Sequence, residues 1–101
     1  MNAQETEGAR ERLLDVSALE PCEPMERALE AVGELQPGEY VRLIHRQEPR
    51  LLYPMLEKLG MAWYTRECDP VEVLIYAKQD ALAARAVAVI AEADGQTLSL
   101  D

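Results

Sequence analysis

The sequence predicts an α/β (α+β) two-layer sandwich, in which two helices cover one face of a four-stranded mixed sheet. Three observations predict it. Segments of strand and helix character follow one another in the order β-α-β-α-β-β over residues 12–78. The chain has 101 residues, 49% of them hydrophobic, which suits a single core and a single domain. A strand, a helix and the next strand of one sheet join by a right-handed crossover, which makes the first two strands parallel.

The first half of the chain supplies a strand, a helix and a second strand. Residues 1–11 are polar, so we expect a flexible leader, and residues 12–17 are predicted to form the first strand. In the strand expected over residues 39–46, alternate residues share one face of the sheet. The helix begins at Pro24, and its apolar residues recur at helical spacing before Gln36-Pro37-Gly38 ends it: Met25, Ala28, Leu29, Val32 and Leu35.

The second half supplies another helix and a pair of strands. The helix opens at Glu48-Pro49 and ends at Gly60. Residues 61–68 and 71–77 are rich in strand-forming side chains and are separated by a turn. Cys68 is then an ordinary strand residue at the end of the first of them. The domain is therefore expected to span residues 12–78.

Residues 79–101 form a C-terminal extension with two possible structures. Apolar residues at helical spacing favour a helix over residues 80–92. The same letters also fit a hairpin around Asp94-Gly95. In either form the apolar stretch 81–90 must be covered, by the rest of the chain or by a second copy in a homodimer.

The charge balance excludes some partners. Ten basic and nineteen acidic residues give a net charge of −9. Such a chain is repelled by phosphates and anionic lipids, so we expect neither nucleic-acid nor membrane binding. No apolar run is long enough to span a bilayer, and two cysteines do not make a disulfide framework, so a cytoplasmic location is expected. Residues 31–60 differ from the rest because they carry four acids and four bases.

Two of these four bases, Arg46 and Arg50, lie near the expected carboxyl edge of the sheet. Open α/β sheets bind ligands at this edge. Arginines and free N–H groups at the start of the second helix are a combination that holds a carboxylate or a phosphate. The alternative is that Arg46 and Arg50 pair with Glu48 and Glu39 on the surface, with His45 a residue at the edge of the core. The candidate ligand-binding residues are Cys22, His45, Arg46, Glu48 and Arg50.

Cys22 is the one candidate nucleophile, because it lies just before the start of the first predicted helix. The dipole of the helix that follows stabilises a thiolate at this position, whereas the negative charges of Glu20, Glu23 and Glu26 destabilise it. The alternative is that Cys22 is a small turn residue with no chemical role. Ligand spacing typical of a zinc site, a phosphate-binding loop or a catalytic triad does not occur. We therefore expect no metal and no cofactor. We also expect no catalytic residue, with Cys22 as a persulfide carrier as the alternative.

Two motifs resemble those of the TusA/SirA-like sulfur-carrier superfamily. The first runs from Leu14-Asp15-Val16 through Leu19-Glu20-Pro21-Cys22-Glu23-Pro24 to Gln36-Pro37-Gly38-Glu39. The second, His45-x-x-Glu48-Pro49-Arg50-x-Leu52-Tyr53-Pro54-x-Leu56-Glu57-x-x-Gly60, is similar to an uncharacterised branch found beside hemerythrin domains in bacteria. The resemblance covers about residues 13–78, and it implies the two-layer fold and a bacterial cytosolic protein.

The resemblance implies sulfur chemistry less directly. The carriers place their persulfide cysteine first in a Cys-Pro-x-Pro motif, whereas this chain reads Pro21-Cys22-Glu23-Pro24. We therefore expect a small non-catalytic accessory domain that binds a small anionic ligand or a protein partner at the carboxyl edge. The alternatives are a sulfur carrier or thiol relay through Cys22, and a purely structural or regulatory interaction domain.

Overall fold

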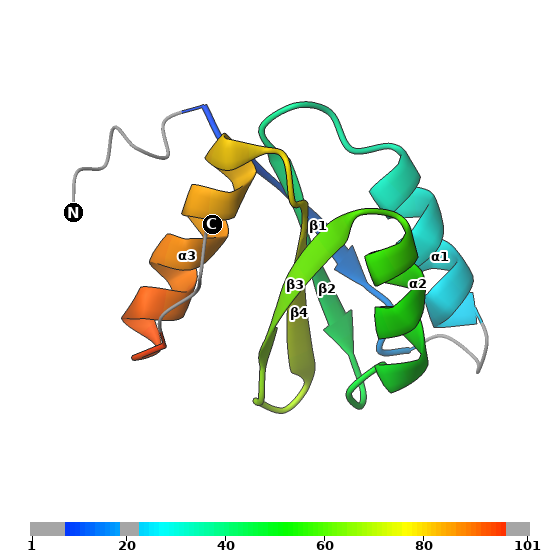
Figure 1. Ribbon diagram of the computed structural model, residues 1–101. Helices are drawn as coiled ribbons and strands as arrows, with labels where there is room; N and C mark the ends of the chain where they lie inside the picture. The colour runs from blue at the N-terminus through cyan, green and yellow to red at the C-terminus, as the bar shows by residue number, and fades with distance from the viewer. Residues whose placement is uncertain (1–7, 19–22, 97–101) are drawn as a thin grey trace.

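Four strands form one mixed sheet in the order β1-β2-β4-β3 (Figure 1). The computed structural model describes residues 8–18 and 23–96. β1 runs parallel to β2, and the other two pairs, β2 with β4 and β3 with β4, are antiparallel. The parallel pair is the one predicted from the crossover rule. The strands are β1 (Arg10–Asp15), β2 (Glu39–His45), β3 (Met61–Arg66) and β4 (Val71–Ala77).

Helices lie on both faces of this sheet. α1 (Glu23–Gly33) and α2 (Tyr53–Lys58), with the 3-10 turn η2 (Arg50–Leu52) before it, cover one face, and α3 (Ala81–Ala93) lies on the other (Figure 1). The predicted sandwich is therefore confirmed, with α3 as an addition behind it. The helix predicted for residues 80–92 is also confirmed, and the alternative hairpin around Asp94-Gly95 is wrong.

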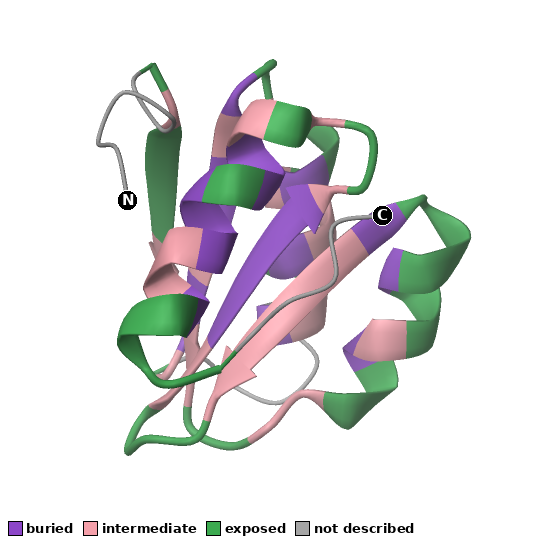
Figure 2. Cartoon of the chain, turned by 60° about the vertical axis from the view of Figure 1, so that its left-hand side comes forward, coloured by how far each residue is buried: buried purple, intermediate pink, exposed green. Residues whose placement is uncertain are grey.

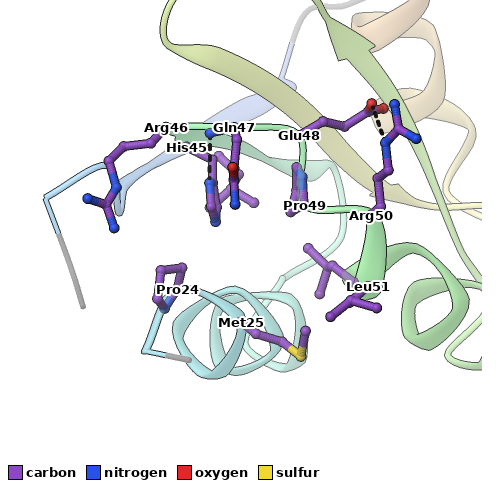
Figure 3. Close-up of a pocket in the computed structure, with 11 residues that line it drawn as sticks. Pro24, Met25, His45, Arg46, Gln47, Glu48, Pro49, Arg50 and Leu51 are labelled. Carbon is purple, nitrogen blue, oxygen red and sulfur yellow. Dashed lines mark hydrogen bonds and ion pairs between the residues drawn. The ribbon is translucent and has the colours of Figure 1, made fainter. Parts of the chain in front are cut away.

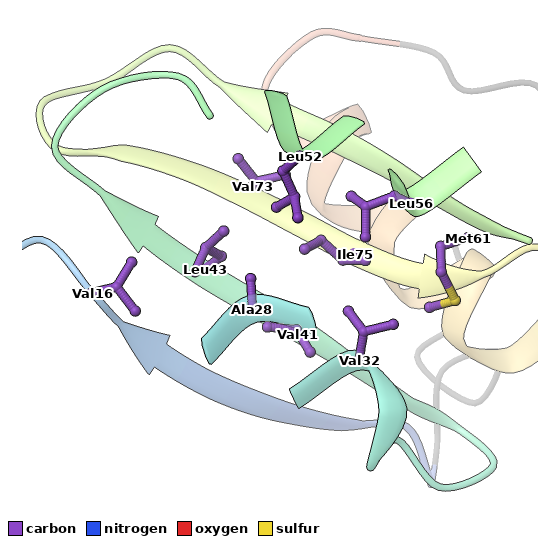
Figure 4. Packing of buried hydrophobic residues seen from close by; sticks show 10 residues of the cluster. All are labelled: Val16, Ala28, Val32, Val41, Leu43, Leu52, Leu56, Met61, Val73 and Ile75. Carbon is purple, nitrogen blue, oxygen red and sulfur yellow. The ribbon is translucent and has the colours of Figure 1, made fainter. Parts of the chain in front are cut away.

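The two faces of the sheet bury separate apolar clusters. Ten residues form the larger cluster, between the sheet and the helices α1 and α2 (Figure 4): Val16, Ala28, Val32, Val41, Leu43, Leu52, Leu56, Met61, Val73 and Ile75. The other cluster lies under α3 and joins Tyr40, Leu74 and Tyr76 to alanines of that helix. Figure 2 shows this burial in the central strands, whereas the edge strand β1 is mostly exposed. The apolar stretch 81–90 thus packs its buried residues against the sheet of its own chain.

Several predicted boundaries differ from the structure. β1 begins at Arg10, inside the predicted leader, because the amide of Arg10 donates to the carbonyl of Gly38 at 3.0 Å and continues the pairing with β2. The second helix starts as a 3-10 turn, because an α-helix from Arg50 would need an N–H at Pro54. β3 ends at Arg66, so Cys68 is an exposed residue of the following turn and the strand prediction for it is wrong.

Asp80 holds together the start of α3 and the turn that leads into β2. Its Oδ1 accepts a hydrogen bond from the amide of Ala83 at 3.1 Å, which caps the helix, and its Oδ2 accepts one from the amide of Gly38 at 2.7 Å. Gly38 has a φ of +83°, and a Cβ there would lie 3.2 Å from the side chain of Leu82. The turn before β2 therefore requires glycine and is tied to α3.

Replacing Asp80 with Ala is expected to lower the free energy of unfolding by about 2–3 kcal/mol, because it removes a helix cap and leaves a partly buried amide without an acceptor. Asp80→Asn retains one acceptor oxygen and should lose about half as much. Urea unfolding followed by circular dichroism measures both. A loss below about 0.5 kcal/mol for Asp80→Ala, the range of ordinary surface changes, would contradict this role.

None of the helices within residues 8–18 and 23–96 is long and apolar enough to cross a membrane.

Candidate functional site

A groove of about 950 Å³ opens at the carboxyl end of β2 (Figure 3). The start of α1 forms one wall, and the loop from β2 into η2 forms the other. Six of the eleven lining residues are apolar, and the polar ones come from the end of β2, the loop and the start of η2. The residues that line the groove are Pro24, Met25, Leu43, His45, Arg46, Gln47, Glu48, Pro49, Arg50, Leu51 and Leu52.

His45 is the last residue of β2 and points into the groove. It lies on the same face of the strand as the buried Val41 and Leu43, as the alternation predicts, and its ring faces the start of α1 (Figure 3). Its Nδ1 accepts a hydrogen bond from the amide of Gln47 at 3.2 Å. This bond assigns the proton of the neutral ring to Nε2, which leaves an N–H donor on the other side of the imidazole.

The surroundings of His45 disfavour its charged form. Burial lowers the pKa of the imidazole first, and the positive charge of Arg46 lowers it further. Arg46 lies beside His45, at the end of the groove away from Glu48 and Arg50 (Figure 3). An anion bound between His45 and Arg46 would counter both effects and favour the imidazolium, whereas protonation of Nδ1 would break its hydrogen bond from the amide of Gln47.

Glu48 is held at the other end of the groove. Its Oε1 accepts from Nε of Arg50 at 3.2 Å and its Oε2 from the hydroxyl of Tyr53 at 3.0 Å. The same hydroxyl lies 2.6 Å from Oγ1 of Thr65, and the ring stacks on Trp63 at 4.8 Å between centroids. Burial raises the pKa of Tyr53 to about 12, so the phenol stays protonated and donates to Glu48. These contacts anchor the loop of the groove to β3.

The hydrogen bond between Tyr53 and Thr65 is expected to contribute about 1 kcal/mol to stability. A double-mutant cycle of Tyr53→Phe and Thr65→Val, read by urea unfolding, measures this coupling while the aromatic ring stays in place. Tyr53→Phe alone should cost more than Thr65→Val alone, because it also removes the donor to Glu48. Equal single losses with no coupling would show that the hydroxyl does not anchor the loop.

The structure brings together four of the five predicted site residues: His45, Arg46, Glu48 and Arg50 line one groove, and Cys22 lies outside the described residues. The surface pairing of Arg50 with Glu48 is present, and the guanidinium of Arg50 is turned away from Met25 and Leu51 (Figure 3). Glu39 pairs with Arg12 at 3.3 Å.

The expectation of free N–H groups at the start of the second helix is wrong for three of the amides there. The amide of Arg50 donates to the carbonyl of Glu48 at 2.9 Å, and that of Leu52 donates to the carbonyl of Pro49 at 3.0 Å. The amide of Tyr53 donates to the carbonyl of Arg50. Because the turn uses these donors itself, the polar groups that line the groove are side chains of the end of β2, the loop and η2.

Two features of the described surface were missed from the sequence. Three of the four exposed large hydrophobic residues of the described chain lie on η2, on α2 and directly after α2: Leu51 (79% exposed), Met55 (39%) and Leu59 (57%). We call these three residues the apolar stripe. Their spacing of four residues places them on one side of a helix, a signal that the sequence contained.

The second missed feature is a row of ion pairs that crosses the face of the sheet under α3. It alternates in sign over all four strands and ends at the helix: Glu11, Arg42, Glu72, Arg66 and Asp94. Arg66 donates to Asp94 twice, at 2.8 and 3.1 Å, and these bonds are the largest cause of the lowered pKa of Asp94. This row ties the end of α3 to β3.

Within the described parts of the chain, no three His, Cys, Asp or Glu side chains are grouped as metal ligands would be.

Residues 13–79, about two thirds of the chain, match the model of a family described as an uncharacterized conserved protein (DUF2249). The match ends just before α3. No curated protein and no solved structure matches the chain.

Proposed function

The chain belongs to the uncharacterised conserved protein family DUF2249, and we propose that it is a non-catalytic binding domain that holds a small anionic ligand in the groove at the carboxyl end of β2. The observation that carries this proposal is the position of His45, which points into the groove with its Nε2 donor available and with Arg46 beside it. A largely apolar cavity with a few converging polar groups, of about 300–1,000 Å³, is typical of small-molecule sites.

The non-catalytic part of the proposal rests on the partners of His45. Its Nδ1 accepts from a backbone amide, whereas a general base is commonly oriented by a carboxylate at that nitrogen. Glu48, the carboxylate in the groove, is occupied by Arg50 and Tyr53. These groups suit recognition of charge rather than proton transfer. The bacterial, cytoplasmic setting and the TusA/SirA-like relationship implied by the motifs belong to the same proposal.

A titration of the full chain followed by amide chemical shifts tests the binding site. The probes are acetate, hexanoate, succinate and inorganic phosphate, each up to millimolar concentration. At least one should shift the amides of residues 45–52, and His45→Ala should weaken that binding about tenfold or more. Arg27→Ala removes an exposed cation of α1 and is the matched control, which should bind like the wild type. No shift with any probe would contradict the proposal.

A protein partner is the second candidate, and the apolar stripe favours it. A monomeric surface seldom groups its large apolar residues in this way unless they contact something. A photocrosslinker placed at Leu59 in cells should yield one discrete adduct, and one placed at the exposed Arg85 of α3 should not. Met55→Glu should abolish the adduct without unfolding the domain, because Met55 lies outside the core clusters. Equal labelling from both positions would contradict a specific partner.

A thiol relay through Cys22 remains the alternative implied by the resemblance. It predicts that the chain gains the mass of one sulfur atom after incubation with a cysteine desulfurase and cysteine. Because Cys68 is exposed, the test uses Cys68→Ser as background and Cys22→Ser as the control that should gain nothing. Absence of the gain in the Cys68→Ser chain would contradict the relay.

A further inference from the structure

We propose that the ligand of the groove is a monocarboxylate with an apolar body of several carbons, whose carboxylate lies at His45 and Arg46 and whose chain lies against Met25 and Leu51. This inference rests on the proposed function and narrows it to one chemical class. The three properties that carry it are the apolar walls, the imidazole N–H of His45 beside Arg46 at one end, and the Glu48–Arg50 ion pair at the other.

The walls of the groove select an apolar body. Met25 on α1 and Leu51 on η2 lie opposite one another (Figure 3), with Pro24 and Pro49 beside them. Leu51 is 79% exposed although it lines the groove, whereas its neighbour Leu52 is 1% exposed and belongs to the core. A hydrocarbon chain between Met25 and Leu51 would remove their apolar surface from water, and each buried methylene then strengthens binding about fourfold.

The charges of the groove select one anionic group. The cationic end consists of Arg46 and the imidazole of His45, which offers one N–H. At the other end Glu48 accepts from Arg50 and Tyr53, so a second carboxylate of the ligand would meet a carboxylate whose cation is already engaged. A dicarboxylate of the same length is therefore expected to bind more weakly than a monocarboxylate.

The number of donors separates a carboxylate from a phosphate. Tight phosphate sites use several backbone N–H groups at a helix or loop terminus. Here the amides of Arg50, Leu52 and Tyr53 bond carbonyls of the same turn. A planar carboxylate needs fewer donors, and Nε2 of His45 supplies one beside the positive charge of Arg46, so inorganic phosphate is expected to bind worse than a carboxylate with a long chain.

The test is a series of dissociation constants for the full chain at one pH, measured from amide shifts. The series comprises acetate, butyrate, hexanoate, adipate, hexanol and inorganic phosphate. Hexanoate should bind about tenfold more tightly than butyrate, and at least tenfold more tightly than adipate, hexanol or phosphate. Leu51→Ala should flatten the dependence on chain length and leave acetate unchanged. His45→Gln should reduce the preference for hexanoate over hexanol.

The outcomes separate this inference from the proposed function. If acetate, adipate or phosphate binds the groove as tightly as hexanoate, the groove is an anion site and the monocarboxylate inference is overturned. If Leu51→Ala leaves the dependence on chain length intact, the apolar wall is not the contact and the inference is again overturned. If none of the probes shifts residues 45–52, the proposed function fails as well.

Discussion

Leu52→Ala is expected to lower the free energy of unfolding by about 2–5 kcal/mol, whereas Leu51→Ala should change it by less than about 0.5 kcal/mol. The two leucines are neighbours in the same 3-10 turn, yet Leu52 is 1% exposed in the larger core cluster and Leu51 is 79% exposed. Truncation of Leu52 removes buried methyl groups and leaves a cavity between η2 and the sheet. Truncation of Leu51 removes surface that water already contacts.

Urea unfolding of the two variants and the wild type, followed by circular dichroism, measures the difference. Because the changes in composition are identical, the pair also controls for any effect of leucine on the unfolded chain. Similar losses for both variants would show that Leu51 is packed in solution. The groove would then lack the exposed apolar wall on which the monocarboxylate inference depends.

The affinity for hexanoate is expected to fall about tenfold between about pH 5.5 and pH 8. In the free protein, burial and Arg46 hold the pKa of His45 below its ordinary value of about 6.5. A carboxylate bound at Nε2 stabilises the cation and raises that pKa, and this stabilisation must exceed the loss of the hydrogen bond that Nδ1 accepts from the amide of Gln47. Binding therefore takes up a proton, so the affinity is highest below the pKa of the free protein and falls as the pH rises toward the pKa of the complex.

His45→Gln supplies the control for this prediction. Glutamine retains a hydrogen-bond donor but does not titrate, so the affinity of this variant should be the same at both pH values, apart from ordinary changes in the charge of the chain. An affinity of the wild type that is independent of pH would mean that the carboxylate binds away from His45.

Much of the fold follows from local sequence patterns. The alternation in β2 placed Val41 and Leu43 on the buried face with His45, and the structure confirms it. Helical spacing likewise predicted α1 and α3. The side of the sheet that α3 covers was not predicted, although the consecutive apolar residues Leu74, Ile75 and Tyr76 of β4 indicate a strand buried on both faces.

The site was harder to derive, because its geometry depends on residues distant in sequence. Four polar residues near the carboxyl end of β2 were predicted from the charge pattern, and they line one groove. Met25 and Leu51 form the apolar walls of the groove only because α1 and η2 pack on the same face of the sheet. The bond of Tyr53 to Thr65 requires α2 to pack against β3. Neither contact is visible in a local pattern.

The binding of a carboxylate at His45 is tested most directly by the pKa of the imidazole, measured by NMR in the free chain and with saturating hexanoate. His45 is the one histidine of the sequence, so its ring signals need no assignment by mutation. We expect the pKa of His45 to lie below its ordinary value of about 6.5 in the free protein and to be higher in the complex. The same pKa with and without hexanoate would show that the carboxylate of hexanoate does not bind at His45, and it would contradict the position proposed here for the ligand.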